Sequence, residues 1–333
     1  MPHPPTRHGL EIKDDLAEVG QSIIDLTTDS ILDNATAKMK STAILILTCI
    51  GLAPFAHGTV RKFIQISDIH YDPTYVEGGN QQKMCHKTLE DDGDDDGASK
   101  YGSYTCDSPK LLVESAFLAM KKWVPDPDFI LWTGDNSAHD DSIAQKDVMS
   151  NLRFVTRKLD TIYPGIPVIP VLGNHDSAPA DYFPDSKNAS TKNTTYSDYI
   201  TDGSFGHWLD PEKGPATEFK ECGFYAFKKP NYDGNVTQTF IVLNTALYYN
   251  NGALDRVSYP LDPCGQFDWL RQTLDDCKPS ERVFIVAHVP PGYFEHNATE
   301  PMFSNENYTR AYLDIVTQKD NAKKVRFYIL LSS

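Results

Sequence analysis

The sequence has few basic residues for its length, and they do not gather into a cluster. Its 333 residues contain 31 Lys and Arg against 46 Asp and Glu, which gives a formal net charge of −15. Nucleic-acid polymers are bound through grouped Lys and Arg side chains that neutralise the phosphates. We therefore expect no nucleic-acid polymer as a partner. A small phosphorylated molecule held by metal ions remains compatible with the acidic balance.

Cys-x-x-Cys pairs, internal repeats and long apolar runs are also missing. The six cysteines are Cys49, Cys85, Cys106, Cys222, Cys264 and Cys277. Without a Cys-x-x-Cys pair, the sequence excludes zinc-ribbon and thioredoxin-type sites. The most apolar stretch, within residues 39–58, is shorter than the roughly 20 residues that a membrane-spanning helix needs.

Residues 39–58 resemble a secretory signal peptide, with a basic start, an apolar core and small residues at the end. Because 38 polar residues precede Met39, we interpret residues 1–38 as a non-native or disordered extension and expect translation to start at Met39. The alternative is a type II membrane anchor with a cytoplasmic tail. Residues 59–333 remain for the folded domain.

Five Asn-x-Ser/Thr sequons follow the signal-like segment. They lie at Asn188, Asn193, Asn235, Asn297 and Asn307. One or two sequons would arise by chance, but five favour the secretory route, in which glycans and disulfides form. We expect Cys85 and Cys106 to pair and close the loop between them, the alternative being two unpaired buried thiols.

Apolar runs that read as strands alternate with segments of helical spacing. The predicted buried strands are residues 59–67, 129–133, 168–172 and 282–287. The predicted helices are residues 110–123, 142–160, 267–274 and 307–316. Residues 224–227 and 239–244 are expected in a second sheet, and residues 325–331 begin a further strand. This order predicts an α/β fold with sheets covered on both faces.

Polar residues of the types that bind metals stand just after four of these strands. They are Asp68, His70, Asp135, Asn174 and His288. In α/β sheets, ligands bind in the crevice beyond the carboxyl ends of the strands. Each motif alone could be a turn or a satisfied polar residue. As a set they predict a two-metal site in which Asp135 bridges, Asp68 and His70 hold the first ion, and Asn174 and His288 hold the second.

Two further histidines are expected beside the metals rather than on them. Two divalent ions about 3.5–4 Å apart can produce a bridging hydroxide, but they do not protonate the departing oxygen. We expect His175 or His139 to supply that proton. Asp176 follows His175 and is expected to orient it. Histidine favours zinc or iron, and oxygen ligands favour harder ions, so these residue types leave the metal open.

Several segments carry a resemblance to a known family. They are residues 67–75, 106–109, 132–135 followed by His139, 173–176, 223–225, 243–245 and 287–293. Together they resemble the calcineurin-like metallophosphoesterases, and within them the acid sphingomyelinase-like phosphodiesterases. The resemblance implies a four-layer α/β/β/α sandwich, two zinc ions, and a monomer that is secreted or lysosomal. It also implies hydrolysis of P–O bonds in nucleotides, phosphocholine-type or sphingolipid phosphodiesters, with a lipid headgroup as one substrate and peripheral contact with a membrane. A related endopolyphosphatase is a further enzyme alternative.

One part of the family pattern is missing from the sequence. The final Gly-His-x-His motif, whose histidines would give one ligand to each metal, is absent, and the chain stops after the strand-like residues 325–331. We interpret the catalytic domain as incomplete at its carboxyl end and lacking its last sheet elements. The rival interpretation is a non-catalytic secreted glycoprotein. The pairing of Cys222, Cys264 and Cys277 is left open: a Cys264–Cys277 pair would leave Cys222 without a partner, unless that partner lay in a lost carboxyl region.

Overall fold

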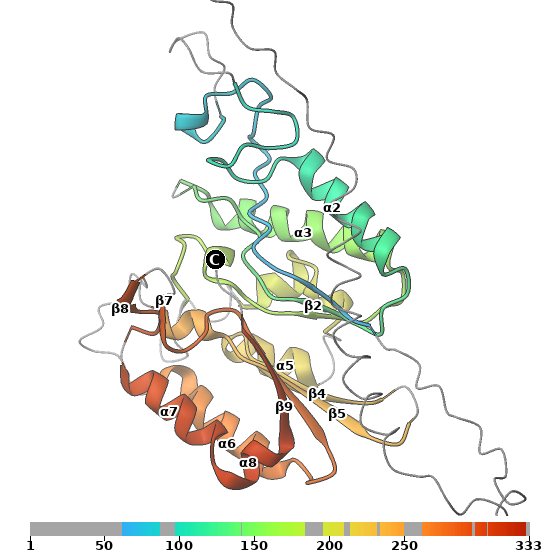
Figure 1. The fold of residues 1–333 in the computed structure, drawn as a ribbon, viewed down its shortest axis with the longest axis vertical. Coiled ribbons are helices and arrows are strands. Elements are labelled where there is room, and N and C mark those ends of the chain that lie inside the picture. Colours follow the sequence, from blue (N-terminus) through green and yellow to red (C-terminus); the bar gives the residue numbers. More distant parts are fainter. Residues whose placement is uncertain are drawn as a thin grey trace, which may run out of the picture. The chain divides into compact units, whose positions relative to one another are not determined.

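A computed structural model gives the fold (Figure 1). The structure describes residues 62–86, 97–140, 142–183, 196–209, 214–231, 234–249, 262–294, 297–304 and 306–330. All of them belong to one compact unit, Val60–Ser333. The expected extension 1–38, the signal-like segment 39–58 and two sequons, Asn188 and Asn193, lie outside the described residues. Within the described ranges, no helix has the length and apolar character to cross a membrane.

The first sheet consists of three short parallel strands in the order β1-β2-β3. These are β1 (Ile64–Ile66), β2 (Ile130–Trp132) and β3 (Val168–Pro170). All of β2 and β3 is buried, as expected for a parallel sheet covered on both faces. The predicted strands are therefore present, each shorter than its apolar run.

Two long helices connect these strands and pack on the first sheet (Figure 1). Helix α2 (Lys110–Trp123) has the predicted bounds and buries Val113 and Phe117. Helix α3 (Gln145–Ile162) buries a row of apolar side chains at helical spacing: Val148, Leu152, Val155 and Leu159. It begins three residues later than predicted because Ala144 is extended, with ψ at 154°.

The second sheet is mixed, with strand order β4-β5-β6-β9. Its strands are β4 (Tyr225–Pro230), β5 (Thr237–Val242), β6 (Arg282–Ala287) and β9 (Val325–Leu330). Strand β4 runs antiparallel to β5, and the other pairs are parallel. A small hairpin, β7 (Tyr293–Phe294) with β8 (Asn297–Pro301), and a short helix, α5 (Gly214–Cys222), lie outside both sheets.

Alternating side chains of the second sheet serve two different cores. Phe240 and Phe284 pack in one core with the first sheet, and the ring of Phe129 lies 5.1 Å and 6.4 Å from their rings. Ile241 and Ile285 point the other way, into a core with the second helical layer. This period of two is the signature of strands buried on both faces.

The second helical layer consists of α6 (Gln266–Asp276), α7 (Glu306–Val316) and the short α8 (Lys319–Lys324). In Figure 1 these helices lie on one side of the second sheet, and α2 and α3 lie beyond the first sheet. The order is therefore helices, sheet, sheet, helices, which confirms the α/β/β/α sandwich. The two sheets meet in the middle, so their strand ends open at a common edge.

The described part of the chain contains two disulfides, one expected and one between cysteines whose pairing the sequence left open. Cys85 pairs with Cys106, as expected. Cys222 pairs with Cys264, their Cα atoms 6.4 Å apart, and Cys277 is a buried free thiol. The Cys264–Cys277 pair, one of those that the sequence left open, does not form, because the 11-residue helix α6 stands between the two cysteines and separates them by roughly 16 Å. Bridged cysteines have Cα atoms within about 7 Å of each other.

Candidate metal centre

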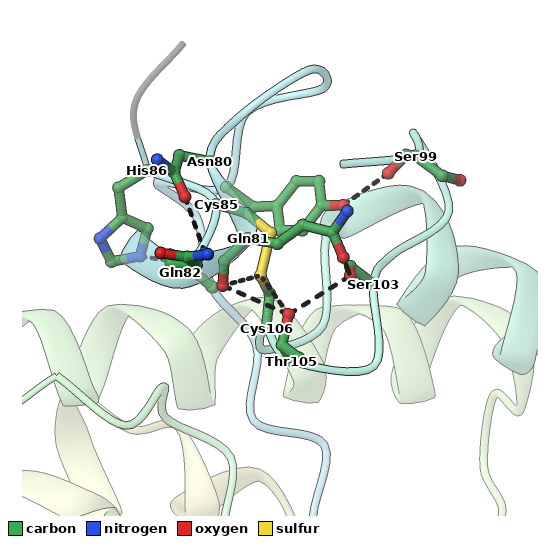
Figure 2. The surroundings of a disulfide bond; sticks show 11 residues. Asn80, Gln81, Gln82, Cys85, His86, Ser99, Ser103, Thr105 and Cys106 are labelled. Carbon is green, nitrogen blue, oxygen red and sulfur yellow. Dashed lines mark hydrogen bonds and ion pairs between the residues drawn. A yellow bond between two sulfur atoms is a disulfide. The ribbon is translucent and has the colours of Figure 1, made fainter. Parts of the chain in front are cut away.

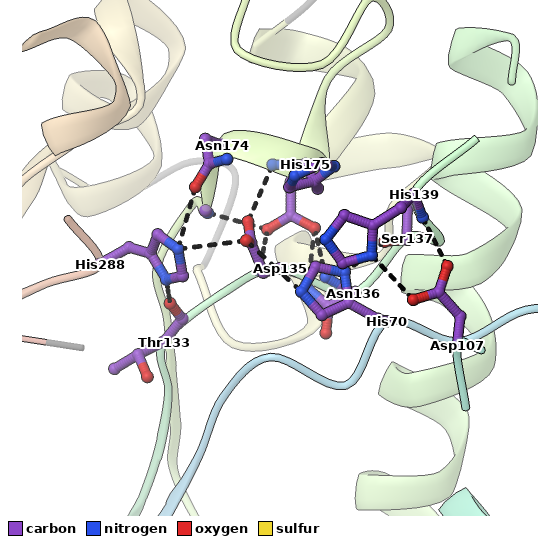
Figure 3. Close-up of polar contacts among 12 residues, drawn as sticks. His70, Asp107, Thr133, Asp135, Asn136, Ser137, His139, Asn174, His175 and His288 are labelled. Atoms are coloured by element: carbon purple, nitrogen blue, oxygen red, sulfur yellow. Dashed lines mark hydrogen bonds and ion pairs between the residues drawn. The ribbon is translucent and has the colours of Figure 1, made fainter. Parts of the chain in front are cut away.

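The loops after β1, β2, β3 and β6 carry the predicted ligands to one place (Figure 3). Asp68 and His70 follow β1, Asp135 follows β2, Asn174 follows β3, and His288 directly follows β6. The carboxyl ends of parallel strands meet at the same edge of a sheet. The structure thus brings all five residues together, although they span 220 positions of the chain.

Asp135 lies at the centre of the group. Its Oδ2 is 3.3 Å from Nε2 of His288 and 3.7 Å from Nε2 of His70, and its Oδ1 accepts the backbone N–H of His175 at 2.8 Å. Burial alone would raise the pKa of Asp135, but the neighbouring histidines, His288 foremost, lower it to about 2. A charged carboxylate therefore sits between two imidazole rings, as a bridging ligand must.

Backbone carbonyls fix both imidazole rings. Nδ1 of His70 lies 2.9 Å from the carbonyl oxygen of Ser137, and Nδ1 of His288 lies 2.8 Å from that of Thr133. A carbonyl only accepts, so each Nδ1 carries a proton, and each Nε2 is directed toward Asp135. Outer hydrogen bonds of this kind are usual for histidines that bind metals through the opposite nitrogen.

The first predicted ion has a suitable donor set. Ligand atoms of Asp68, His70 and Asp135 lie within 4.8 Å of one another. Nε2 of His70 is buried and has no hydrogen-bond partner in the described part of the chain. A buried nitrogen lone pair left without a donor is costly unless a cation takes it. One imidazole nitrogen and two carboxylates fit a divalent ion.

The second predicted ion has an amide oxygen and an imidazole. Oδ1 of Asn174 lies 3.2 Å from Nε2 of His288. The amide of Asn174 donates through Nδ2 to Asp181 at 2.9 Å, which turns its oxygen toward the site. Burial would lower the pKa of His288, but Asp135 raises it to about 9, so without a metal this ring holds a proton that a cation would displace.

Unusual backbone geometry lets the ligand loops touch. Asp68, His70 and Asp135 all have positive φ, at 51°, 40° and 56°. Such conformations are strained for residues other than glycine and concentrate at functional sites. A Cβ on Gly173 would lie 2.1 Å from Oδ1 of Asp135, and one on Gly134 would lie 2.3 Å from the backbone nitrogen of Gly173. Only glycine permits this close approach.

Asp176 has a different role from the one expected. Its carboxylate accepts backbone N–H groups of Asp135 at 3.0 Å, Asn136 at 2.9 Å and Gly173 at 2.9 Å. The expectation that Asp176 orients His175 is wrong, because its oxygens are taken by the two ligand loops. Burial first, and Asp135 second, raise the pKa of Asp176 to about 6. Asp176 therefore joins the loops that follow β2 and β3.

His139 and His175 lie beside the proposed ligands rather than among them (Figure 3). The ring of His139 stacks on that of His70, with centroids 4.0 Å apart, and meets His175 edge-on at 4.4 Å. The pKa of His139 is raised, above all by its hydrogen bond with Asp107. Burial lowers the pKa of His175 to about 4. Of the two rings, that of His139 therefore keeps its proton to the higher pH.

Asp107 is the partner of His139 that the sequence did not indicate. Its Oδ1 lies 2.8 Å from Nδ1 of His139, and its Oδ2 accepts the backbone N–H of His139 at 2.6 Å. Asp107 lies in a segment that carries the family resemblance, residues 106–109, but nothing in the local pattern paired it with a histidine 32 residues away. Asp181 was missed for the same reason.

The family model that describes the calcineurin-like phosphoesterase matches residues 61–315. The chain belongs to this family. The matched region contains every proposed ligand of the metal centre, from Asp68 to His288. Divalent metal ions are the family's cofactors, and the donor sets found here suit such ions.

This phosphoesterase is similar to curated phosphodiesterases. It is 34% identical over 270 residues to acid sphingomyelinase-like phosphodiesterase 3b of Homo sapiens, covering 80% of this chain and 56% of that protein. It is 35% identical to sphingomyelinase phosphodiesterase C of Dictyostelium discoideum, covering 70% and 50%. It is 31% identical to cyclic GMP-AMP phosphodiesterase SMPDL3A of Rattus norvegicus, covering 84% and 60%.

The chain spans between half and three fifths of the length of these curated relatives. Among solved structures, it is similar to the purple acid phosphatase PPD1 from yellow lupin (Lupinus luteus) seeds. That likeness has a TM-score of 0.42 and 14% identity, and covers 81% of this chain and 37% of the phosphatase.

Proposed function

We propose that this chain is a phosphoric diester hydrolase that cleaves a P–O bond with the help of two divalent metal ions. The observation that carries the proposal is the placement of Asp135 between His70 and His288, each ring directing Nε2 toward its carboxylate. Asp68 and Asn174 complete the two donor sets. Family membership and the similarity to named phosphodiesterases support the reaction class.

When bound, the metal pair would supply a nucleophile from water and neutralise charge on the phosphoryl oxygens. The chain's own residues do the rest. Asp135 stays ionised at the centre of the site, and the carbonyls of Ser137 and Thr133 keep His70 and His288 in the tautomer that directs Nε2 inward. The hydrogen bond with Asp107 raises the pKa of His139 beside the site, which favours this ring as the donor of a proton to the departing oxygen.

We propose zinc as the metal, because imidazole nitrogens occur in both donor sets together with carboxylate and amide oxygen. For the substrate we propose a small phosphodiester, either a nucleotide or a phosphocholine-type headgroup. Relatives are named for cyclic GMP-AMP and for sphingomyelin, which are both phosphodiesters. A polyphosphate chain is less favoured, because polyanions require grouped basic side chains.

We further propose that the protein enters the secretory route and is glycosylated there. The two disulfides support this, since such bonds persist in oxidising compartments. Asn235, in the turn between β4 and β5, and Asn307, in the first turn of α7, are both exposed, as glycan acceptors must be. Asn297 is the first residue of β8.

The first experiment expresses the 333-residue chain with its disulfides formed and measures bound metal together with hydrolysis of bis(4-nitrophenyl) phosphate. We expect about two zinc ions per chain and turnover that a chelator removes and zinc restores. Cyclic GMP-AMP, sphingomyelin in detergent micelles and inorganic polyphosphate then rank the substrate classes. If the folded protein shows neither bound zinc nor turnover, it is instead a non-catalytic glycoprotein.

We also propose that the outer face of α2 contacts a membrane that contains anionic lipid. Leu111 and Leu118 are two helical turns apart on this face, Trp123 ends the helix, and Leu118 and Trp123 are 67% and 73% exposed. Lys110 precedes Leu111, and Lys122 lies between Leu118 and Trp123, in a chain whose net charge is strongly negative. Apolar and aromatic side chains between lysines favour the interface of an anionic bilayer.

Sedimentation with phosphatidylcholine vesicles that contain about one fifth phosphatidylserine tests this contact. We expect Leu118→Glu to reduce the bound fraction several-fold, because it places a charge on the apolar face. Leu313→Glu is the matched control, since Leu313 is 43% exposed on α7, in the other helical layer. Equal binding by both variants would contradict a contact through α2.

A further inference from the structure

The Cys85–Cys106 disulfide is connected to the metal centre on both of its sides. The residue after Cys106 is Asp107, which binds His139 at Nδ1 and at the backbone N–H. The residue after Cys85 is His86, whose Nε2 lies 2.7 Å from Oδ2 of Asp72. The covalent bond thus joins two segments that each reach a loop of the site.

Backbone hydrogen bonds connect the same segments to the ligand loops. The N–H of Ser108 donates to the carbonyl of His70 at 2.9 Å, and the N–H of Asp72 donates to the carbonyl of Ser108 at 3.0 Å. The N–H of Tyr71 donates to the carbonyl of Asn136 at 2.7 Å. Asp107 therefore lies between Cys106 of the disulfide and Ser108, whose backbone is hydrogen-bonded to the segment that carries the proposed ligand His70.

On the other side of Cys106, polar contacts near the surface hold the chain (Figure 2). Oγ1 of Thr105 donates to the carbonyl of Gln81 at 3.2 Å, and the N–H of Cys106 donates to the carbonyl of Ser103 at 3.1 Å. Thr105 is exposed, whereas Cys85 is fully buried. Hydrogen bonds of this kind contribute about 1 kcal/mol each. The disulfide is the strong attachment of this segment.

The hydrogen bond with Asp107 orients the ring of His139, which also stacks on the ring of His70 and meets that of His175 edge-on. The side chain of His139 is 46% exposed, whereas that of Asp107 is 8% exposed. Two oxygens of one buried carboxylate hold both the backbone and the ring, and they keep a proton on Nδ1, which leaves Nε2 as the nitrogen that does not bind Asp107. Displacing Asp107 would remove the hydrogen bond that orients the ring and sets its tautomer.

We propose that Asp107 is a positioning residue for His139 and that the Cys85–Cys106 disulfide keeps Asp107 in place. This inference rests on the proposed phosphodiesterase function. Reduction by a dithiol converts a disulfide to two cysteine thiols while the dithiol becomes a disulfide, but it would act on Cys222–Cys264 as well. Replacing Cys85 and Cys106 by alanine removes the one bond alone, and the protein then keeps its metal ligands but loses the fixed ring of His139.

The first test compares Asp107→Asn with the wild type on bis(4-nitrophenyl) phosphate. We expect kcat to fall by about 10–100-fold with KM and bound zinc unchanged, because a positioned proton donor contributes about 10²–10⁴-fold and this variant removes part of its positioning. Asp107→Glu, which restores the carboxylate, should recover part of kcat. Asp140→Asn is the matched control, because Asp140 directly follows His139 in the chain but its carboxylate binds Ser142 instead.

The second test asks whether the disulfide acts through Asp107. We expect the double variant Cys85→Ala, Cys106→Ala to lose about 10-fold in kcat, and to lose almost nothing further when Asp107→Asn is already present. Residues that act through one network show such non-additive losses. Independent, additive losses would overturn the proposal, because the disulfide would then act by another route.

A readout that needs no turnover separates this inference from the proposed function. Imidazole ¹⁵N NMR of the metal-free protein, with His139 assigned by His139→Gln, reports the tautomer of the ring. We expect the His139 signals to change in the same way in Asp107→Asn and in the Cys85→Ala, Cys106→Ala variant. If they change but the wild type shows no turnover, only the proposed function fails. If the double variant leaves them unchanged, the positioning role is wrong.

Discussion

Replacing Asp135 with alanine is expected to abolish metal binding and turnover together. Asp135 has both oxygens in use, Oδ2 beside His70 and His288 and Oδ1 on the backbone of His175. Both proposed donor sets include this carboxylate, so its loss weakens both ions at once. Losing an outer partner of a ligand costs roughly 10–100-fold in metal affinity or activity. Losing the shared ligand should cost more.

Metal analysis and thermal unfolding measure this result. Zinc that binds the native state raises its stability, by about 2.7 kcal/mol at one hundred times the dissociation constant. We expect added zinc to raise the unfolding temperature of the metal-free wild type and to leave that of Asp135→Ala nearly unchanged. Asp126→Ala, which removes an exposed carboxylate in the turn after α2, is the control. An Asp135→Ala protein that keeps both ions would refute the bridging role.

The sequence predicted the parts of this site whose signal is local. Each proposed ligand stands within a few residues of the end of an apolar run, as His288 does after β6 and Asn174 after β3. Strand ends in such a fold meet at one edge, so strand order alone brings the ligands together. Helix α2 was also predicted residue for residue, because Pro109 precedes it and prolines follow it.

The supporting contacts could not be predicted, because they depend on how loops pack. Asp107 reaches His139 across 32 residues, and Asp176 reaches Asn136 across 40. Neither pair lies on a common helix or strand, so no periodicity connects them. Adjacency in sequence was even misleading, since Asp176 is next to His175 but binds the backbone of Gly173 and of the loop after β2. The Cys222–Cys264 pair likewise required knowing that α6 separates Cys264 from Cys277.

The next largest effects are expected from the two histidines beside the ligands. His175→Ala and His139→Gln should each keep bound zinc and lose turnover, because neither side chain belongs to a proposed donor set. A positioned proton donor or acceptor contributes about 10²–10⁴-fold. His207→Gln is the control, since His207 pairs with Asp160 at the surface. Loss of zinc in His175→Ala would instead make His175 a metal ligand.

The pH dependence of kcat then assigns the proton to one of the two rings. The pKa of His139 is raised, chiefly by Asp107, so its protonated form persists to higher pH than that of an ordinary histidine. The pKa of His175 is lowered to about 4 by burial, so this ring is already neutral above that value. If His139 protonates the departing oxygen, kcat falls as pH rises through its pKa. We expect His139→Gln to lose this alkaline fall and His175→Ala to retain it. The opposite pattern would make His175 the proton donor, with His139 serving to orient it.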